Sequence, residues 1–192
     1  MKKGIIVIVV LVLLGMFGCG KYNGLVKQDE NVKNKWGAVQ SQYQRRSDLI
    51  PNLVSTVKGA ADFEKTTLTE VMEARAKATQ VTIDADNLTP EKIQQFQQAQ
   101  GQLGAALGRL LAVSENYPTL QANQNFRDLQ AQLEGTENRI TVARNDFNNA
   151  VNEYNSTVRV FPGNLVAGIA GFKQKGYFQA QPGSENAPKV QF

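Results

Sequence analysis

Apolar side chains recur at alternating intervals of three and four residues along two long stretches, which constrains the fold more than any other feature of this chain. That interval directs one side of an α-helix toward partner helices. The first stretch follows Val32, Trp36, Val39, Tyr43, Arg46, Ile50, Leu53, Val57, Ala60 and Glu64. The second follows Phe126, Leu129, Leu133, Thr136, Ile140, Ala143, Phe147, Ala150, Tyr154, Val158 and Phe161. The pattern predicts an all-α fold: a long antiparallel up-and-down helical bundle with coiled-coil-like spacing.

The breakers between these stretches predict where helices begin and end. We expect the first bundle helix over residues 25–79, with a kink or pause at Pro51, because proline lacks a backbone donor and clashes with the carbonyl four residues earlier. Residues 80–89 have no helical period and predict a surface loop. Thr89 is then expected to cap a second helix.

The second helix is predicted to end at Asn116-Tyr117-Pro118, since the residue before a proline avoids helical geometry. Asn123 is a plausible cap for the third helix, which Pro162-Gly163 should stop. The apolar segment 165–172 is expected to cap the open end of the bundle, and contact with lipid is the alternative.

The N-terminus carries an uncharged run from Gly4 to Gly20 behind a basic start. Its dense apolar part, residues 5–17, is shorter than the roughly 20 residues that a helix needs to cross a bilayer. A basic start and a short apolar region are typical of an export signal. We therefore divide the chain into a signal or anchor segment (1–20), a helical bundle (21–180) and an extended C-terminal tail (181–192).

Gly18-Cys19 resembles a lipoprotein processing site, at which cleavage behind Gly18 would leave Cys19 lipidated at the new N-terminus. Phe17 is large where a small residue is usual, and Met16 replaces the usual leucine, so an uncleaved transmembrane anchor is the equal alternative. Either way the product stays on a membrane. The basic N-terminus favours an extracytoplasmic bundle.

Composition argues against several function classes. The chain has no histidine and one cysteine, so neither an intrachain disulfide nor a cysteine-based zinc site can form. The formal net charge is only +4, and no basic run with interleaved aromatics supports nucleic-acid binding. The glutamates on the second stretch lack the Glu-x-x-His pairs of di-iron bundles. We expect no enzymatic activity, no metal or other cofactor and no small-molecule substrate.

Ordered motifs resemble the LemA family from about Tyr22 to the end of the chain. They are Tyr22-Asn23-Gly24-Leu25-Val26, Trp36, Gln44-Arg45-Arg46-Ser47-Asp48-Leu49-Ile50-Pro51-Asn52-Leu53-Val54, Val57-Lys58-Gly59, Ala74-Arg75-Ala76, Glu115-Asn116-Tyr117-Pro118, Leu133-Glu134-Gly135-Thr136-Glu137-Asn138-Arg139-Ile140, Ala143-Arg144 and Tyr154-Asn155. By family match the site candidates are Arg45, Arg46, Asp48, Pro51 and Asn52. For Arg46 we expect a buried or half-buried structural role.

The resemblance implies a membrane-anchored helical bundle with no agreed biochemical activity, and kinship with proteins of membrane compartments such as magnetosomes. We therefore expect a scaffold or adaptor of the bacterial cell envelope that holds membrane lipid through its N-terminal anchor and has another envelope protein as partner. Self-association is left open. The alternative is a lipid-binding or membrane-shaping protein of a membrane compartment.

Overall fold

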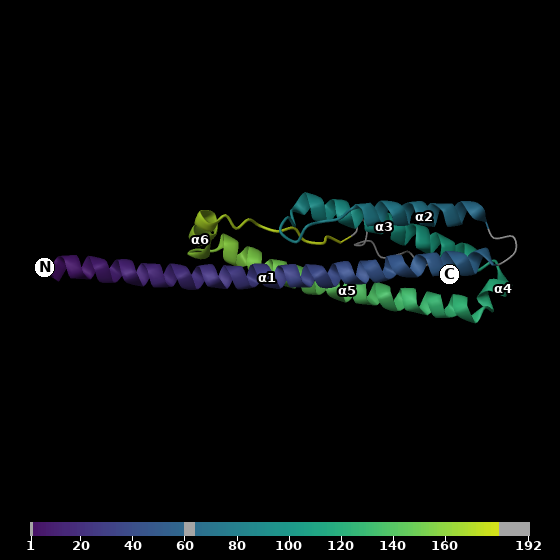
Figure 1. Ribbon diagram of the computed structural model, residues 1–192, viewed down its shortest axis with the longest axis horizontal. Coiled ribbons are helices and arrows are strands. Elements are labelled where there is room, and N and C mark those ends of the chain that lie inside the picture. Colours follow the sequence, from purple (N-terminus) through teal and green to yellow (C-terminus); the bar gives the residue numbers. More distant parts are fainter. Residues whose placement is uncertain (1, 60–63, 181–192) are drawn as a thin grey trace, which may run out of the picture.

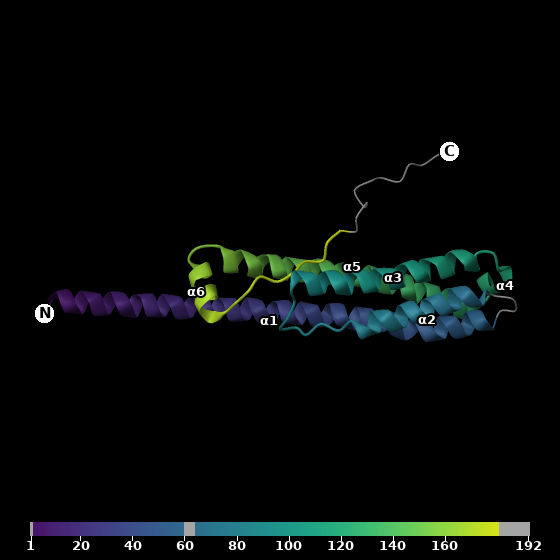
Figure 2. The same cartoon turned by 90° about the horizontal axis from the view of Figure 1, so that it is seen from above.

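The computed structural model describes residues 2–59 and 64–180, and all regular secondary structure in these ranges is helical. The helices are α1 (Lys2–Lys58), α2 (Lys65–Gln80), α3 (Pro90–Ser114), α4 (Pro118–Gln121), α5 (Gln124–Arg159) and α6 (Gly163–Ala170). The four long helices run alternately away from and toward the N-terminal end (Figure 1 and Figure 2). The predicted antiparallel up-and-down bundle is confirmed.

The first helix differs from its prediction at both ends. It begins at Lys2, so the N-terminal apolar stretch and the first bundle helix are one continuous helix, and it ends at Lys58 instead of continuing to residue 79. The Gly59 N–H bonds back to the Thr56 carbonyl, and the chain resumes as α2 at Lys65. The reversal has a packing reason: it lets apolar residues on either side of the break face one another in the bundle interior.

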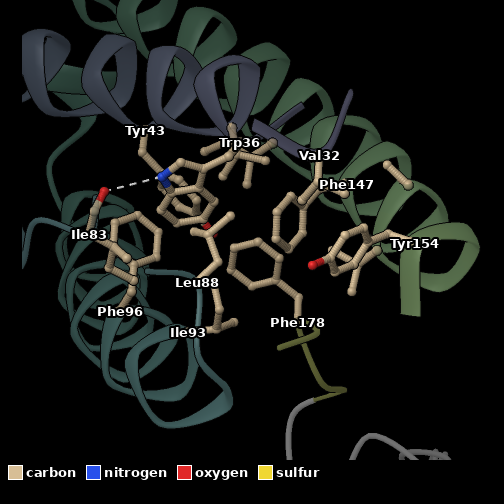
Figure 3. Close-up of a cluster of buried hydrophobic side chains, with 14 of the residues drawn as sticks. Val32, Trp36, Tyr43, Ile83, Leu88, Ile93, Phe96, Phe147, Tyr154 and Phe178 are labelled. Carbon is tan, nitrogen blue, oxygen red and sulfur yellow. Dashed lines mark hydrogen bonds between the residues drawn. The ribbon is translucent and has the colours of Figure 1, made fainter. Parts of the chain in front are cut away.

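The interior consists of two apolar clusters arranged along the bundle axis. The distal core, far from the N-terminus, contains Ile50, Leu53, Val54, Val57, Leu68, Val71, Ala78, Leu103, Ala106, Leu107, Leu110, Leu120, Phe126 and Leu133. The proximal core contains Leu25, Val32, Trp36, Val39, Tyr43, Ile83, Leu88, Ile93, Phe96, Ile140, Phe147, Ala150, Val151, Tyr154, Ala167 and Phe178 (Figure 3). The four long helices and α4 enclose the distal core, whereas α2 and α3 are too short to cover all of the proximal one.

Two non-helical segments complete the proximal core. The surface loop predicted over residues 80–89 forms over residues 81–89 between α2 and α3, but Ile83 and Leu88 are 5% and 2% exposed. Trp36 Nε1 donates to the Ile83 carbonyl at 3.3 Å (Figure 3). The loop therefore acts as a lid over the aromatic cluster, because its apolar side chains replace those that a longer α2 would supply.

The second segment, residues 171–180, runs back over the bundle after α6 (Figure 2). Gly171 ends α6 in the left-handed region with φ of 79°, a conformation that favours glycine. Phe178 then enters the aromatic cluster, where its ring centroid lies 6.1 Å from that of Trp36. Gly176 passes so close to α3 that an added Cβ would lie 2.6 Å from Pro90 Cα.

The predicted helix caps are present. The Thr89 side chain accepts from the Lys92 N–H, with Pro90 at the first helical position, and the Asn123 side chain accepts from the Phe126 N–H. The prediction that Phe161 lies on the apolar seam is wrong, since α5 ends at Arg159 and the Phe161 side chain is 74% exposed. The predicted tail, residues 181–192, lies outside the described residues.

Candidate functional site

A polar layer separates the two cores, and Arg46 is at its centre. Its side chain extends from α1 into the bundle, and the residue is 3% exposed. Nη1 donates to Glu137 Oε1 on α5 at 2.8 Å, and Nη2 donates to Gln100 Oε1 and to the Gln100 carbonyl on α3 at 2.6 and 3.1 Å. This guanidinium therefore ties α1 to two other helices, with the planar two-pronged geometry that lysine cannot supply.

Gln100 extends the layer to the fourth helix. The residue is 8% exposed, and its Nε2 donates to the Ala78 carbonyl on α2 at 3.3 Å. The Arg46 guanidinium lies 4.9 Å from the centroid of the Tyr43 ring, a cation–π contact. Burial raises the pKa of the Tyr43 hydroxyl, and the positive charges of Arg144 and Arg46 partly oppose that rise.

Pro51 lacks a backbone N–H donor, and this absence creates another contact in the same region. A residue at position 51 would normally bond its N–H to the carbonyl of Ser47, four residues earlier, and proline cannot do so. The helix nevertheless continues through Pro51 to Lys58, so of the predicted kink or pause at Pro51 the pause does not occur. Arg75 on α2 supplies the missing donor, because its Nε lies 2.9 Å from the Ser47 carbonyl oxygen.

The chemistry of this layer is that of a structural clasp. A guanidinium is permanently charged and offers donors only, so it can neither accept a proton nor attack an electrophile. Acceptor oxygens on α3 and α5 hold the Arg46 guanidinium in place. A cavity of ≈ 320 Å³ beside it is lined by Glu137, Arg144 and glutamines. Across residues 2–59 and 64–180, no three His, Cys, Asp or Glu side chains gather in a way that could hold a metal ion.

Comparison with known proteins shows the family. A model of the LemA family matches residues 35–192, most of the chain. The chain belongs to the LemA family. Relatives include Magnetosome protein MamQ 2 of Paramagnetospirillum magneticum, 29% identical over 186 residues that cover 86% of this chain and 67% of the relative. Magnetosome protein MamQ of Magnetospirillum gryphiswaldense is 27% identical over the same shares, and Protein LemA of Metamycoplasma hominis is 24% identical over 84% and 70%.

The motif residues of this LemA family chain point to opposite sides of α1. Arg46 turns inward to the polar layer, whereas Arg45, Asp48 and Asn52 are exposed. These three line a shallow groove of ≈ 510 Å³ with Ser41, Gln42, Gln44 and Leu49. We name it the outer motif face. Gln44 Nε2 donates to Asp48 Oδ1 at 2.8 Å, which holds that carboxylate along the helix surface.

The five candidates named from the sequence therefore do not form one site. Arg46 makes hydrogen bonds inside the bundle, and Pro51 leaves the Ser47 carbonyl free to accept from Arg75. The other three residues line the outer motif face on the surface. The expectation of a buried role for Arg46 is confirmed by its 3% exposure. Its partners Gln100 and Glu137 lie on α3 and α5, and the sequence did not show the helix pairing that brings them to Arg46.

A group of amides holds the 171–180 segment, and only one of them, Asn155, lies in a motif quoted from the sequence. Asn155 and Lys175 exchange two hydrogen bonds through the lysine backbone, at 2.8 and 2.9 Å. Asn148 binds the backbone of Phe178 in the same way at 2.9 Å twice, and Gln97 binds Gln179 at 2.8 and 3.0 Å. Asn148 and Asn155 lie two helical turns apart beside the apolar seam. That spacing, which places both amides on one side of α5, is the sequence feature that could have indicated a bound segment.

The N-terminal part of α1 has a different environment. By length and composition, one helix in the described ranges can cross a membrane, and its apolar window is not buried in the bundle. Exposed residues there include Ile5, Leu11, Val12 and Phe17, at 52–62%. Cys19 is also exposed on this helix. The stretch is a candidate membrane anchor, and lipidation of Cys19 stays a prediction.

Proposed function

We propose that this LemA family protein is a membrane-anchored, non-catalytic scaffold or adaptor of the bacterial cell envelope. The observation that carries the proposal is the continuity of α1, in which an exposed apolar stretch and the longest core-forming face of the bundle belong to one helix. A break between the two would make the bundle a freely tethered domain. A continuous helix makes the bundle a post whose orientation follows that of the anchor.

The dimensions suit a post. At 1.5 Å per residue, the part of α1 beyond Gly20 rises by about 55–60 Å. The outer motif face occupies the side of this helix well above the anchor, and its polar and charged groups of both signs suit a protein partner with a complementary polar surface. We propose another envelope protein as that partner.

The interior supports a structural role over a catalytic one. The buried arginine is held by Gln100 and Glu137, and its environment offers no nucleophile paired with a base. The relatives point in the same direction, since two of them carry the name of a membrane compartment, the magnetosome. For this chain we propose a role in organising a membrane-bound assembly.

Photo-crosslinking in cells tests the adaptor role. A photoreactive residue at position 45, 48 or 52 samples the outer motif face, and one at Val142, an exposed residue of α5, serves as the control. We expect one product of constant mass from the three face positions, absent at position 142 and reduced by adding Asp48→Lys to the chain probed at position 45 or 52. A product at the mass of two copies identifies the partner as the chain itself.

Products that are equally abundant from the control position, or none from the face at several probe chemistries, contradict the adaptor role.

Two further measurements test the placement of the protein in the envelope. Protease added to intact spheroplasts should digest an extracytoplasmic bundle, and full protection contradicts that orientation. The intact mass of the membrane-extracted protein shows whether the residues before Cys19 are absent and whether acyl mass has been added.

A further inference from the structure

We propose that α6 and the turn before it rest in the headgroup region of the bilayer, as a second membrane contact that fixes the tilt of the bundle. This inference rests on the membrane anchoring proposed above. The partner is the bilayer surface itself, and the features that recognise it are apolar side chains flanked by cations. Figure 1 shows that α6 lies at the anchor-proximal end of the bundle.

The first observation is an apolar surface that the bundle leaves uncovered. Val160, Phe161, Leu165 and Ile169 are 62%, 74%, 57% and 91% exposed. The other face of α6 packs inward, since Ala167 is 2% exposed and Val166 lies against the proximal core. Capping of the bundle therefore uses one side of this short helix and leaves the second side free.

The exposed side chains are concentrated in one place. Beyond Tyr22, the other exposed large apolar residues in the described ranges are Met72, Val142 and Tyr177, which lie on three separate segments. Single exposed residues of this kind are normal on soluble surfaces, whereas a contiguous group marks an interaction site. The group on α6 and the preceding turn thus calls for a partner.

The position of this apolar group along the axis of α1 identifies that partner. The Phe172 ring, directly after α6, lies 5.9 Å from the ring of Tyr22 and packs against the proximal core that includes Leu25. Tyr22 and Leu25 follow the end of the uncharged run, Gly20, by only about 3–8 Å of helical rise. Interfacial helices bury their apolar faces about 5–10 Å into the boundary between headgroups and acyl chains. We infer from the contact between Phe172 and Tyr22 that the exposed side of α6 lies at that level.

Charge agrees with this placement. Lys21, Lys27, Arg159 and Lys173 are exposed at this end of the molecule. The nearby acid Asp29 is occupied, since Lys33 Nζ and Lys175 Nζ lie 3.1 and 2.9 Å from its oxygens. Exposed cations beside an apolar surface favour a bilayer that contains anionic lipid.

Fluorescence quenching in vesicles tests the contact with the full chain. In a Cys19→Ser background that retains residues 1–20, an environment-sensitive fluorophore is attached at Ile169→Cys. Val142→Cys serves as the solvent control and Val12→Cys as the anchor control, both at exposed positions. The vesicles contain phosphatidylcholine and phosphatidylglycerol with a phospholipid that bears a nitroxide quencher, at a shallow position to probe residue 169 and at a deep position to probe residue 12.

We expect quenching at position 169 several-fold above that at position 142, and lower when phosphatidylglycerol is omitted. Adding Phe161→Asp to the Ile169→Cys chain should reduce the quenching without changing circular dichroism, because Phe161 makes no part of the core. Quenching at position 12 but not at 169 overturns the α6 contact and leaves the anchor standing. No quenching at position 12 overturns both, and indifference to phosphatidylglycerol overturns the role of the cations.

Discussion

The Nε atom of Arg75 lies 2.9 Å from the backbone carbonyl oxygen of Ser47, the carbonyl that Pro51 leaves without its helical donor. A side chain of α2 thus completes the hydrogen bonding of α1 at the point where proline interrupts it. The relationship explains how α1 crosses Pro51 without stopping, since the orphaned carbonyl is satisfied from outside the helix.

This pairing predicts a dependence between two positions. Arg75→Met should lower the free energy of unfolding by about 1–3 kcal/mol, because it leaves the Ser47 carbonyl without a donor. In a Pro51→Ala background the loss should be smaller, since an N–H at position 51 then supplies the helical bond. Chemical unfolding of the four chains in detergent micelles measures the coupling. Equal losses in both backgrounds would show that Arg75 acts elsewhere.

The polar layer around Arg46 predicts a second non-additive pair. Gln100→Leu removes an acceptor from a buried guanidinium and should destabilise the bundle by about 2–3 kcal/mol. Adding Arg46→Met should recover part of that loss, because an apolar pair leaves no buried charge without acceptors. Denaturant unfolding compares the single and double variants. A double variant less stable than the Gln100→Leu chain would contradict the account of the layer.

Phe178 predicts the contribution of the 171–180 segment. Phe178→Ala should cost about 3–5 kcal/mol, because the ring is 5% exposed and contacts the rings of Trp36, Phe96 and Phe147. Tyr177→Ala is the matched control at a neighbouring, 39% exposed position, where we expect less than about 1 kcal/mol. Similar losses at the two positions would mean that the segment is not docked as described.

The buried tyrosines predict an alkaline limit to stability. Burial, aided by the negative charge of Asp29, raises the pKa of Tyr154 to about 12, and burial raises that of Tyr43 as well. Unfolded tyrosine ionises near pH 10, so above that pH the unfolded state binds fewer protons and is favoured. The stabilisation is complete below about pH 10 and is lost as the pH rises toward 12.

Tyrosinate absorbance during an alkaline titration measures this directly, with Tyr154→Phe to assign the late step. The substitution also removes the hydrogen bond from the Tyr154 hydroxyl to the Lys173 carbonyl, which should cost about 1 kcal/mol at neutral pH. A late step that persists in the Tyr154→Phe chain at unchanged amplitude would assign it to another residue.

Periodicity was sufficient for the helical parts of the fold. Thr89 and Asn123 cap helices as their residue types predict, and the seam from Phe126 to Tyr154 lies in the interior because a regular helix keeps its register. The register failed beyond the helix end, at Phe161. The prediction of a continuous helix failed at Gly59. Small residues there are compatible with a continuing helix, and only the tertiary pairing of α1 with α2 favours a reversal of the chain.

Contacts between segments that are far apart in the chain could not be predicted from the sequence. Phe178 follows a glycine-containing segment without any period, and its burial depends on a groove between α3 and α5 that exists only in the folded bundle. The same holds for the candidate site. The motif named Arg46 and Pro51 as candidates, but the residues that they act with, Gln100, Glu137 and Arg75, lie on other helices.

Flotation after alkaline carbonate extraction is the most direct test of an anchor and a bundle built on one helix. Membranes that contain the full chain are washed and floated beside those with Leu11→Arg and Leu13→Arg, which alter only exposed positions of α1. We predict that the wild-type chain floats with lipid and that the substituted chain is released as a folded, helical protein. Release of the wild-type chain, or flotation of both chains alike, would contradict the account.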